Sequence, residues 1–250
     1  MSSQALKLRR MLEQRFPDAM PLRHRTSEVV ATGISALDRV LPGGGLPRGR
    51  LVAWWPGGGA RALLWWACGE VMARGQRAAW VDASGISGAV AEWEAGWCGR
   101  RERLGPVSSP LGRLPVLVHP AGPVEALACT EELLTSGGFG LLVLAGVSDF
   151  SASAGVRLSR AAQSGGGAFV LVGQAPPVAS LRVAARIVPE GYRWRRDAFG
   201  DPAEVESVGV DMEVAGLGLL ARTEFRMRVV SHEVCLSLEP GLADRRSAAG

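Results

Sequence analysis

The chain has 250 residues, of which 47% are hydrophobic and 21% are charged. This length suits one domain with a sizeable core, and the composition excludes a chain that is disordered throughout. The formal net charge is +4 and comes almost entirely from arginine, since Lys7 is the only lysine. A mild basic excess is compatible with binding to nucleic acid or to an acidic partner, but codon usage that favours arginine explains it equally well.

The cysteines and the apolar segments limit the environment in which the chain works. The N-terminus lacks the apolar core of a signal peptide, and no window approaches the ~20 apolar residues of a membrane span. The cysteines lie far apart, so that no pair has the spacing of metal ligands. We therefore expect a cytoplasmic protein with reduced thiols, no metal site and no membrane contact. The cysteines are Cys68, Cys98, Cys129 and Cys235.

The first residues have the pattern of an amphipathic helix over 5–16. Pro17 ends this helix, and a connecting arm follows. We interpret residues 1–31 as an N-terminal helix and arm that docks on another chain, and packing back on its own core is the alternative. The apolar face that would make the contact consists of Leu8, Met11, Leu12 and Phe16.

From about residue 32 the pattern alternates between strands and helices, which defines a core over 32–190. Short strands that are apolar on both faces, separated by helices, predict an α/β fold with a mostly parallel sheet flanked by helices. Strands are expected at 51–55, 76–81, 115–119, 140–145 and 168–172, and helices at 59–74, 86–99, 123–137 and 151–164.

After about residue 180 the segments become short, alternating and rich in β-branched residues. They predict a C-terminal extension of β-hairpins, which we assign to 191–240, and residues 241–250 are expected to be a disordered tail. The expected strands in this part of the chain are 181–188, 208–214, 217–230 and 234–238.

A charged loop is expected at 193–201, with the sequence RWRRDAFGD. Its first residues mix cations with an aromatic ring, a combination suited to phosphate contact and base stacking in DNA. A solvated basic loop explains the same residues at least as well. The candidate DNA contacts are Arg193, Trp194, Arg195 and Arg196.

Two glycine-rich stretches frame the strand expected at 51–55. The upstream stretch reads TGISALDRVL over 32–41 and GGGLPRGR over 43–50, and the downstream stretch reads WPGGGARAL over 55–63. The upstream pattern, TG-x-x-x-LD-x-x-L followed by GGLP-x-GR, resembles the segment that leads into the P-loop strand of RecA and its relatives. The resemblance covers roughly residues 30–190 and implies a RecA-like core.

The downstream stretch lies where a P-loop would cradle phosphates with backbone N–H groups and a helix N-terminus. The working pattern is G-x-x-x-x-G-K-[ST]. Here Trp55 replaces the first glycine, Ala60 the second, Arg61 the lysine and Ala62 the hydroxyl residue that holds Mg²⁺. A planar guanidinium differs from a compact ammonium, and a methyl group is no metal ligand. The vestigial P-loop comprises Pro56, Gly57, Gly58, Gly59, Ala60, Arg61 and Ala62.

Two further positions lack the residues that a RecA-type ATPase uses. The Mg²⁺ carboxylate is expected at the end of an apolar strand, where the chain has Ala145 and Gly146. The glutamate that activates water is expected where Ser84 stands, and a serine does not deprotonate water in its place. We therefore expect no ATP hydrolysis and no catalytic residue, while weak ATP binding without turnover stays open. Asp82 or Asp149 in the place of a missing carboxylate is the alternative.

Bulky residues and a glutamine lie near this vestigial loop in the sequence. Gln174 follows an apolar strand where RecA relatives have a glutamine that senses the nucleotide. The segment after it is too short for the long DNA-binding loop of RecA, so we expect no strand exchange and no present role for Gln174. We also expect bulky indole rings to fill the vacated nucleotide space, and these belong to Trp54, Trp55, Trp65 and Trp66.

A RecA-like chain of this size, with a short N-terminal helix and a degenerate P-loop, resembles the ImuA family. These are RecA-like, SulA-related accessory proteins of bacterial mutagenesis cassettes. The resemblance implies a role in SOS-induced translesion synthesis after DNA damage. It implies an ImuB-like polymerase homologue and an error-prone polymerase subunit as partners, with RecA as a further one, and a location at the nucleoid after damage. Self-association through the N-terminal helix is also expected, because RecA protomers associate in this way.

Two other classes of function stay open beside a non-catalytic accessory protein. One is a DNA-dependent RecA-like ATPase or recombinase with unusual site residues. The other is a SulA-like inhibitor that binds the cell-division protein FtsZ. Turnover of ATP would identify the first, and binding to FtsZ would identify the second.

Overall fold

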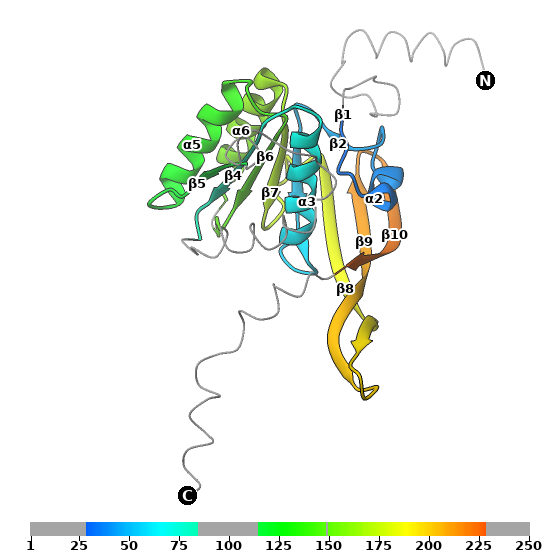
Figure 1. Ribbon diagram of the computed structural model, residues 1–250. Coiled ribbons are helices and arrows are strands. Elements are labelled where there is room, and N and C mark those ends of the chain that lie inside the picture. The colour runs from blue at the N-terminus through cyan, green and yellow to red at the C-terminus, as the bar shows by residue number, and fades with distance from the viewer. Residues whose placement is uncertain (1–28, 85–114, 149, 229–250) are drawn as a thin grey trace, which may run out of the picture.

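The computed structural model describes residues 29–84, 115–148 and 150–228 (Figure 1). Within these residues, one sheet has the strand order β10-β9-β8-β3-β7-β6-β4-β5. Neighbouring strands from β8 to β5 are parallel, whereas β9 is antiparallel to both β8 and β10. The expected α/β fold with a mostly parallel sheet is therefore confirmed. The strands are β3 (Leu51–Trp54), β4 (Ala78–Asp82), β5 (Val116–Val118), β6 (Leu141–Ala145), β7 (Ala168–Val172), β8 (Leu181–Arg196), β9 (Pro202–Gly216) and β10 (Leu219–Arg228).

Helices cover both faces of the sheet, as the apolar strands require. Helix α3 (Ala60–Ala73) packs on one face, against a cluster that includes Trp54 and Trp80. Helices α5 (Pro123–Thr135) and α6 (Ala152–Gly165) pack on the other face, over the alternate residues of the same strands. Every residue of β3, β4, β6 and β7 is buried, which explains why these strands read as continuous apolar runs.

The ends of the helices follow the local chemistry of the sequence. Helix α5 begins with Pro123 in its first turn, and the hydroxyl of Ser151 caps α6 by accepting a hydrogen bond from the Ala154 amide. Gly75 and Gly137 follow α3 and α5 with positive φ, which only glycine adopts at low cost. These helices lie within one or two residues of their expected positions.

The segment before β3 contains three short elements that the sequence did not predict. Strands β1 (Val29–Val30) and β2 (Leu46–Pro47) pair with each other, and helix α2 (Ser35–Val40) lies between them in the chain. Helix α2 lies beside β10, so this segment covers the antiparallel end of the sheet (Figure 1).

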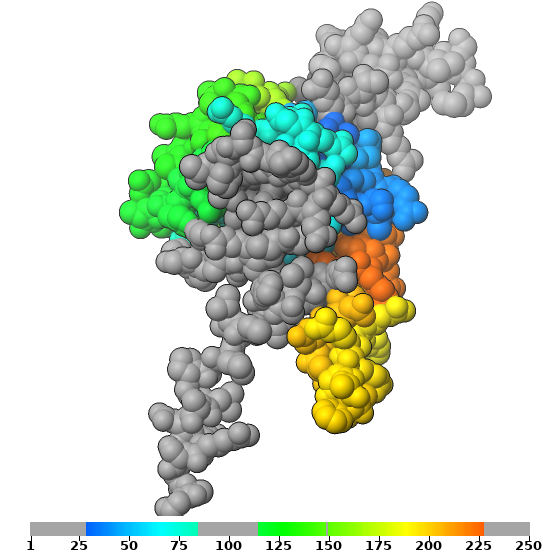
Figure 2. Space-filling view, viewed as in Figure 1, coloured from blue at the N-terminus to red at the C-terminus, as the bar shows by residue number. Residues whose placement is uncertain are grey.

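The C-terminal hairpin is longer than expected, and the charged loop expected at 193–201 is wrong in its first half. Arg193–Arg196 continue β8 and pair with β9, for example Trp194 with Val205. An irregularity in the pairing after Val188 interrupts the alternating pattern, which is why the sequence suggested that the strand ended there. The far end of this hairpin extends beyond the rest of the sheet (Figures 1 and 2).

Several expectations fall outside the described residues. They are the N-terminal helix with Leu8, Met11, Leu12 and Phe16, the helix at 86–99, the strand at 234–238 and the tail at 241–250. In the part of the chain that is described, no helix is long and apolar enough to cross a membrane.

Candidate functional site

The vestigial P-loop occupies the expected place between β3 and α3. Strand β3 ends at Trp54, and Gly59 is the N-cap residue of α3. Gly58 has a φ of 55°, and a Cβ at this position would come within 2.1 Å of the carbonyl oxygen of Ala185 in β8. Glycine is therefore required here both by its backbone conformation and by the close approach of β8.

Arg61, at the position of the P-loop lysine, forms an ion pair with Asp82 at the end of β4. Its Nη2 donates to Oδ2 of Asp82 over 2.5 Å. The other carboxylate oxygen, Oδ1, accepts hydrogen bonds from the Ser84 amide at 2.9 Å and from the Ser84 hydroxyl. The side chain of Asp82 is fully buried, while that of Arg61 is 32% exposed. A buried carboxylate is stable only when its charge is compensated, and Arg61 together with Ser84 provides this compensation.

Gly146, which follows the end of β6, has no space for a side chain that would hold Mg²⁺. The Ala83 amide donates to the carbonyl oxygen of Ala145 at 2.9 Å, which brings the ends of β4 and β6 together. Gly146 follows with a φ of 79°, and a Cβ there would lie 2.2 Å from the Ser84 amide nitrogen. An aspartate at this position would collide with the backbone of the β4 end.

These residues do not fit Mg²⁺ and ATP as a working P-loop ATPase would hold them. The charge of Arg61 is already engaged by Asp82, and Ala62 carries no oxygen for the metal. Both oxygens of Asp82 are hydrogen-bonded, so this residue does not replace the missing carboxylate in the arrangement described. Asp149, the other alternative, lies outside the described residues.

The tryptophans around the loop differ in burial, so they do not form one group that fills the nucleotide space: Trp54 is buried, Trp65 is partly buried, and Trp55 and Trp66 are exposed. Trp54 is fully buried in the core between the sheet and α3. Trp65 stacks on Trp80, with ring centroids 4.1 Å apart and planes inclined by 10°. Trp55 is 58% exposed and Trp66 is 44% exposed. The expectation that all four fill a vacated site is wrong for these two outward-facing rings.

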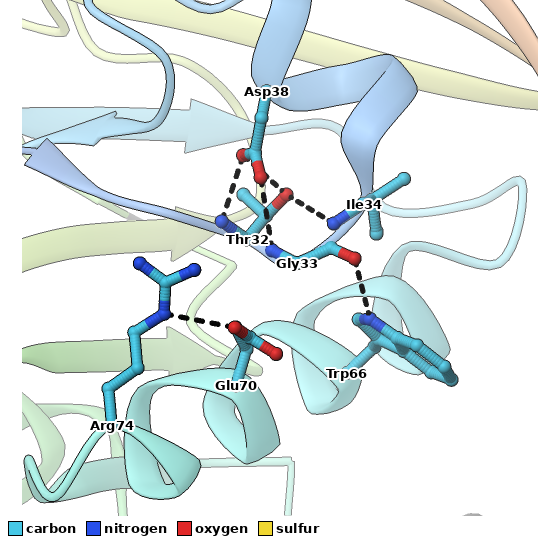
Figure 3. Close-up of polar contacts among 7 residues, drawn as sticks. All are labelled: Thr32, Gly33, Ile34, Asp38, Trp66, Glu70 and Arg74. Carbon is cyan, nitrogen blue, oxygen red and sulfur yellow. Dashed lines mark hydrogen bonds and ion pairs between the residues drawn. The ribbon is translucent and has the colours of Figure 1, made fainter.

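The upstream TG-x-x-x-LD pattern forms a structural contact, which we call the N-terminal clamp (Thr32, Gly33, Ile34 and Asp38; Figure 3). One oxygen of Asp38 accepts hydrogen bonds from the Thr32 amide at 2.9 Å and the Thr32 hydroxyl at 2.8 Å. The other oxygen accepts from the Gly33 amide at 3.1 Å, and the Ile34 amide donates to the Thr32 hydroxyl at 3.2 Å. The motif that carries the family resemblance is thus a folding feature.

The N-terminal clamp rests on α3, the helix that follows the vestigial P-loop (Figure 3). The indole Nε1 of Trp66 donates to the Gly33 carbonyl oxygen at 3.3 Å. Gly33 has a φ of 73°, and a Cβ there would come within 2.8 Å of the Glu70 side chain. Glu70 in turn pairs with Arg74 at 2.9 Å. Trp66 and Glu70 are contacts that the sequence analysis missed, although their spacing of four residues places them on one helix face.

The candidate DNA contacts lie on the distal part of the hairpin formed by β8 and β9. Arg195 pairs with Glu204 on the opposite strand, and Nη1 of Arg196 donates to the Gly200 carbonyl oxygen at 2.5 Å. Both arginines therefore form bonds within the hairpin. Their contact with DNA stays a prediction. Gln174 follows β7 as an exposed residue, and β8 begins shortly afterwards, at Leu181.

Cys68 lies in the core, and its burial decides its reactivity. Burial raises the pKa of the Cys68 thiol to about 12, so this residue is protonated at neutral pH and is a poor nucleophile. Among the described side chains, no three or more of the types His, Cys, Asp and Glu gather as metal ligands.

In comparisons with known proteins, the chain matches neither a protein-family model nor a curated protein sequence.

Proposed function

We propose that this chain is a non-catalytic, RecA-like accessory protein of SOS-induced translesion synthesis, which works in the cytoplasm and at the damaged nucleoid by binding other proteins. The RecA-like part of the proposal is supported by a glycine-rich loop that directly follows a central parallel strand and directly precedes a helix. It is supported further by the upstream sequence pattern, whose residues form the N-terminal clamp against that helix.

The ion pair between Arg61 and Asp82 is the observation that carries the non-catalytic part of the proposal. A P-loop lysine works because its charge is directed at phosphate oxygens. Arg61 directs its charge at a buried carboxylate, which competes with any phosphate for the same guanidinium. Two metal-ligand positions also lack an oxygen-bearing side chain, Ala62 in the first turn of α3 and Ala145 at the end of β6. These substitutions likewise oppose ATP hydrolysis and support a role in binding.

The test is direct binding of the purified chain to purified candidate partners. The partners are an ImuB-like polymerase homologue, an error-prone polymerase subunit and RecA, with FtsZ as the discriminating control. We expect a Kd on the order of 1 μM or tighter for at least one of the first three and no measurable binding to FtsZ. Binding to FtsZ alone would replace the proposal by an inhibitor of cell division.

A separate variant tests, in the same binding assay, whether the N-terminal helix docks on RecA. Leu12→Asp and Phe16→Asp place charges on the apolar face expected for residues 5–16. We expect this double variant to lose RecA binding by at least about tenfold, because a buried charge without a partner opposes docking. Unchanged binding of RecA would show that another surface makes the contact.

A further inference from the structure

The distal hairpin, residues 189–206, stands apart from the helices that cover the sheet (Figures 1 and 2). In the part of the chain that the structure describes, β8 is paired with β3 only from Leu181 to Val183, and β9 is paired with β10 only from Ser207 onward. Beyond these points, among the described residues, the two strands pair only with each other, and the one further hydrogen bond runs from Arg226 of β10 to the Gly191 carbonyl oxygen at 3.1 Å. A two-stranded ribbon has little stability of its own. Because the ribbon adds little to the core, its length favours a role in contacting another molecule.

Three aromatic side chains of the distal hairpin are exposed. Tyr192 is 42%, Trp194 is 51% and Phe199 is 91% exposed, and the rings of the first two lie 6.4 Å apart. Large rings at the surface cost free energy unless something covers them. Tyrosine and tryptophan are also the residue types that contribute most to protein–protein interfaces.

The charges of the distal hairpin favour a protein over a nucleic acid as its partner. The segment carries three arginines against five carboxylates, a net charge of −2 in a chain whose total is +4. Arg195 and Arg196 are bonded within the hairpin, whereas the exposed Glu190 and Glu206 form no ion pair with described residues. Nucleic-acid binding depends on an excess of cations that face the phosphates, and this segment has an excess of anions. Exposed acidic side chains on the same segment as exposed aromatic rings complement a basic protein surface with apolar pockets.

We propose that the distal hairpin is a docking site for a partner protein that offers an apolar pocket bordered by basic side chains. Trp194 and Phe199 enter the pocket, and Glu190 and Glu206 face its rim. This inference rests on the proposed function in one respect, namely that the chain acts by binding proteins. It adds a surface and a partner chemistry, and this surface is separate from the N-terminal helix.

The test uses the full chain and the same three purified partners. The double variant Trp194→Ser with Phe199→Ser removes the two rings, and Leu220→Ser on β10 is the matched control, because Leu220 is 74% exposed but lies outside the distal hairpin. We expect the double variant to bind at least one partner more weakly by about tenfold or more, and the control to bind within about twofold of the wild type. Charge reversal by Glu190→Lys with Glu206→Lys should weaken the same complex, most strongly at low salt.

Thermal unfolding of each variant is measured beside the binding. Because the replaced rings are exposed, we expect unchanged melting temperatures, and a loss of binding then reports the contact itself. Equal partner binding by the wild type and the double variant would overturn the docking site but leave the proposed function intact. Failure of the wild type to bind any of the three would overturn both.

Two further outcomes would assign the hairpin to a different occupant and overturn the proposal. The first is weaker binding of a fluorescent single-stranded oligonucleotide by the double variant, with protein binding unchanged. The second is self-association of the wild type in light scattering that the double variant loses.

Discussion

Asp82 has its carboxylate at the carboxyl end of β4, where both oxygens are already hydrogen-bonded. Arg61 is bound to one oxygen and the amide and hydroxyl of Ser84 to the other. The pair joins the first turn of α3 to the neighbouring part of the sheet, so a position that would bind phosphate in an ATPase stabilises the fold here. The role of these two residues can therefore be tested by measuring the stability of variants as well as their ATPase activity.

We predict that Arg61→Met destabilises the protein more than Arg61→Met combined with Asp82→Asn. The single change leaves a buried carboxylate without its cation, whereas the double change removes the charge and keeps an acceptor for Ser84. Because Arg61 is 32% exposed, we expect about 2 kcal/mol for the single change, below the 3–5 kcal/mol of a fully buried pair. Urea unfolding measures both values. Equal midpoints for the single and double variants would contradict the ion-pair account.

The substitutions at the P-loop positions could be recognised in the sequence, but the residues that they contact in the folded protein could not. Arg61, Ala60 and Ala62 are visible because they depart from a fixed pattern. The bond from Arg61 to Asp82 spans 21 residues and exists only because β4 ends beside α3. The outward position of Trp55 and Trp66 was also hidden, since a tryptophan fits a core and a surface contact equally well.

The segment from β1 to β2 is held in place by few backbone contacts of its own. Its regular elements are two short strands and the helix α2. It is fixed by the N-terminal clamp, in which Asp38 accepts three hydrogen bonds from Thr32 and Gly33, and by the burial of Leu37 and Leu46 in the core. The clamp is also joined to α3, because the indole Nε1 of Trp66 donates a hydrogen bond to the Gly33 carbonyl oxygen.

We predict that Asp38→Ala lowers the free energy of unfolding by about 2 kcal/mol, because a charged acceptor is removed from three donors. Thr32→Val is the milder companion variant, since it removes the hydroxyl but keeps the amide donor, and we expect about 1 kcal/mol for it. Hydrogen exchange should show faster exchange of the Thr32 and Gly33 amides in Asp38→Ala, with the amides of β6 unaffected. A wild-type exchange rate at Thr32 would rule out the clamp.

The regular elements of the core follow from periodicity and from glycine and proline, which is why they were predictable. Strands such as β6 and β7 are buried on both faces and therefore read as unbroken apolar runs. The hairpin was not predictable at its far end, because β8 beyond Val188 has no buried face and its pairing with β9 is irregular. The short elements β1, α2 and β2 depend in part on contacts with α3 and β10, which lie at a distance in the sequence.

The molecule as a whole has helices on both faces of a mostly parallel sheet, and the glycine-rich loop lies at the carboxyl end of a central strand. Helix α3 crosses one face of the sheet and α6 crosses the other. Because β3, β4 and β6 are parallel, their carboxyl ends lie at the same edge of the sheet. At this end Gly58 touches β8, Gly146 touches the Ser84 backbone and Arg61 binds Asp82. Two charged groups at the end where an ATPase places phosphates and metal, Arg61 and Asp82, are thus bound to each other.

ATP binding and hydrolysis by the purified wild-type chain, with and without single-stranded DNA and beside an active RecA control, test this account most directly. The account predicts no hydrolysis above the protein-free background in either condition, because the charge of Arg61 is engaged and the metal ligands are missing. Hydrolysis stimulated by DNA would contradict it, and would mean that the bond between Arg61 and Asp82 opens to release both groups for a working ATPase site.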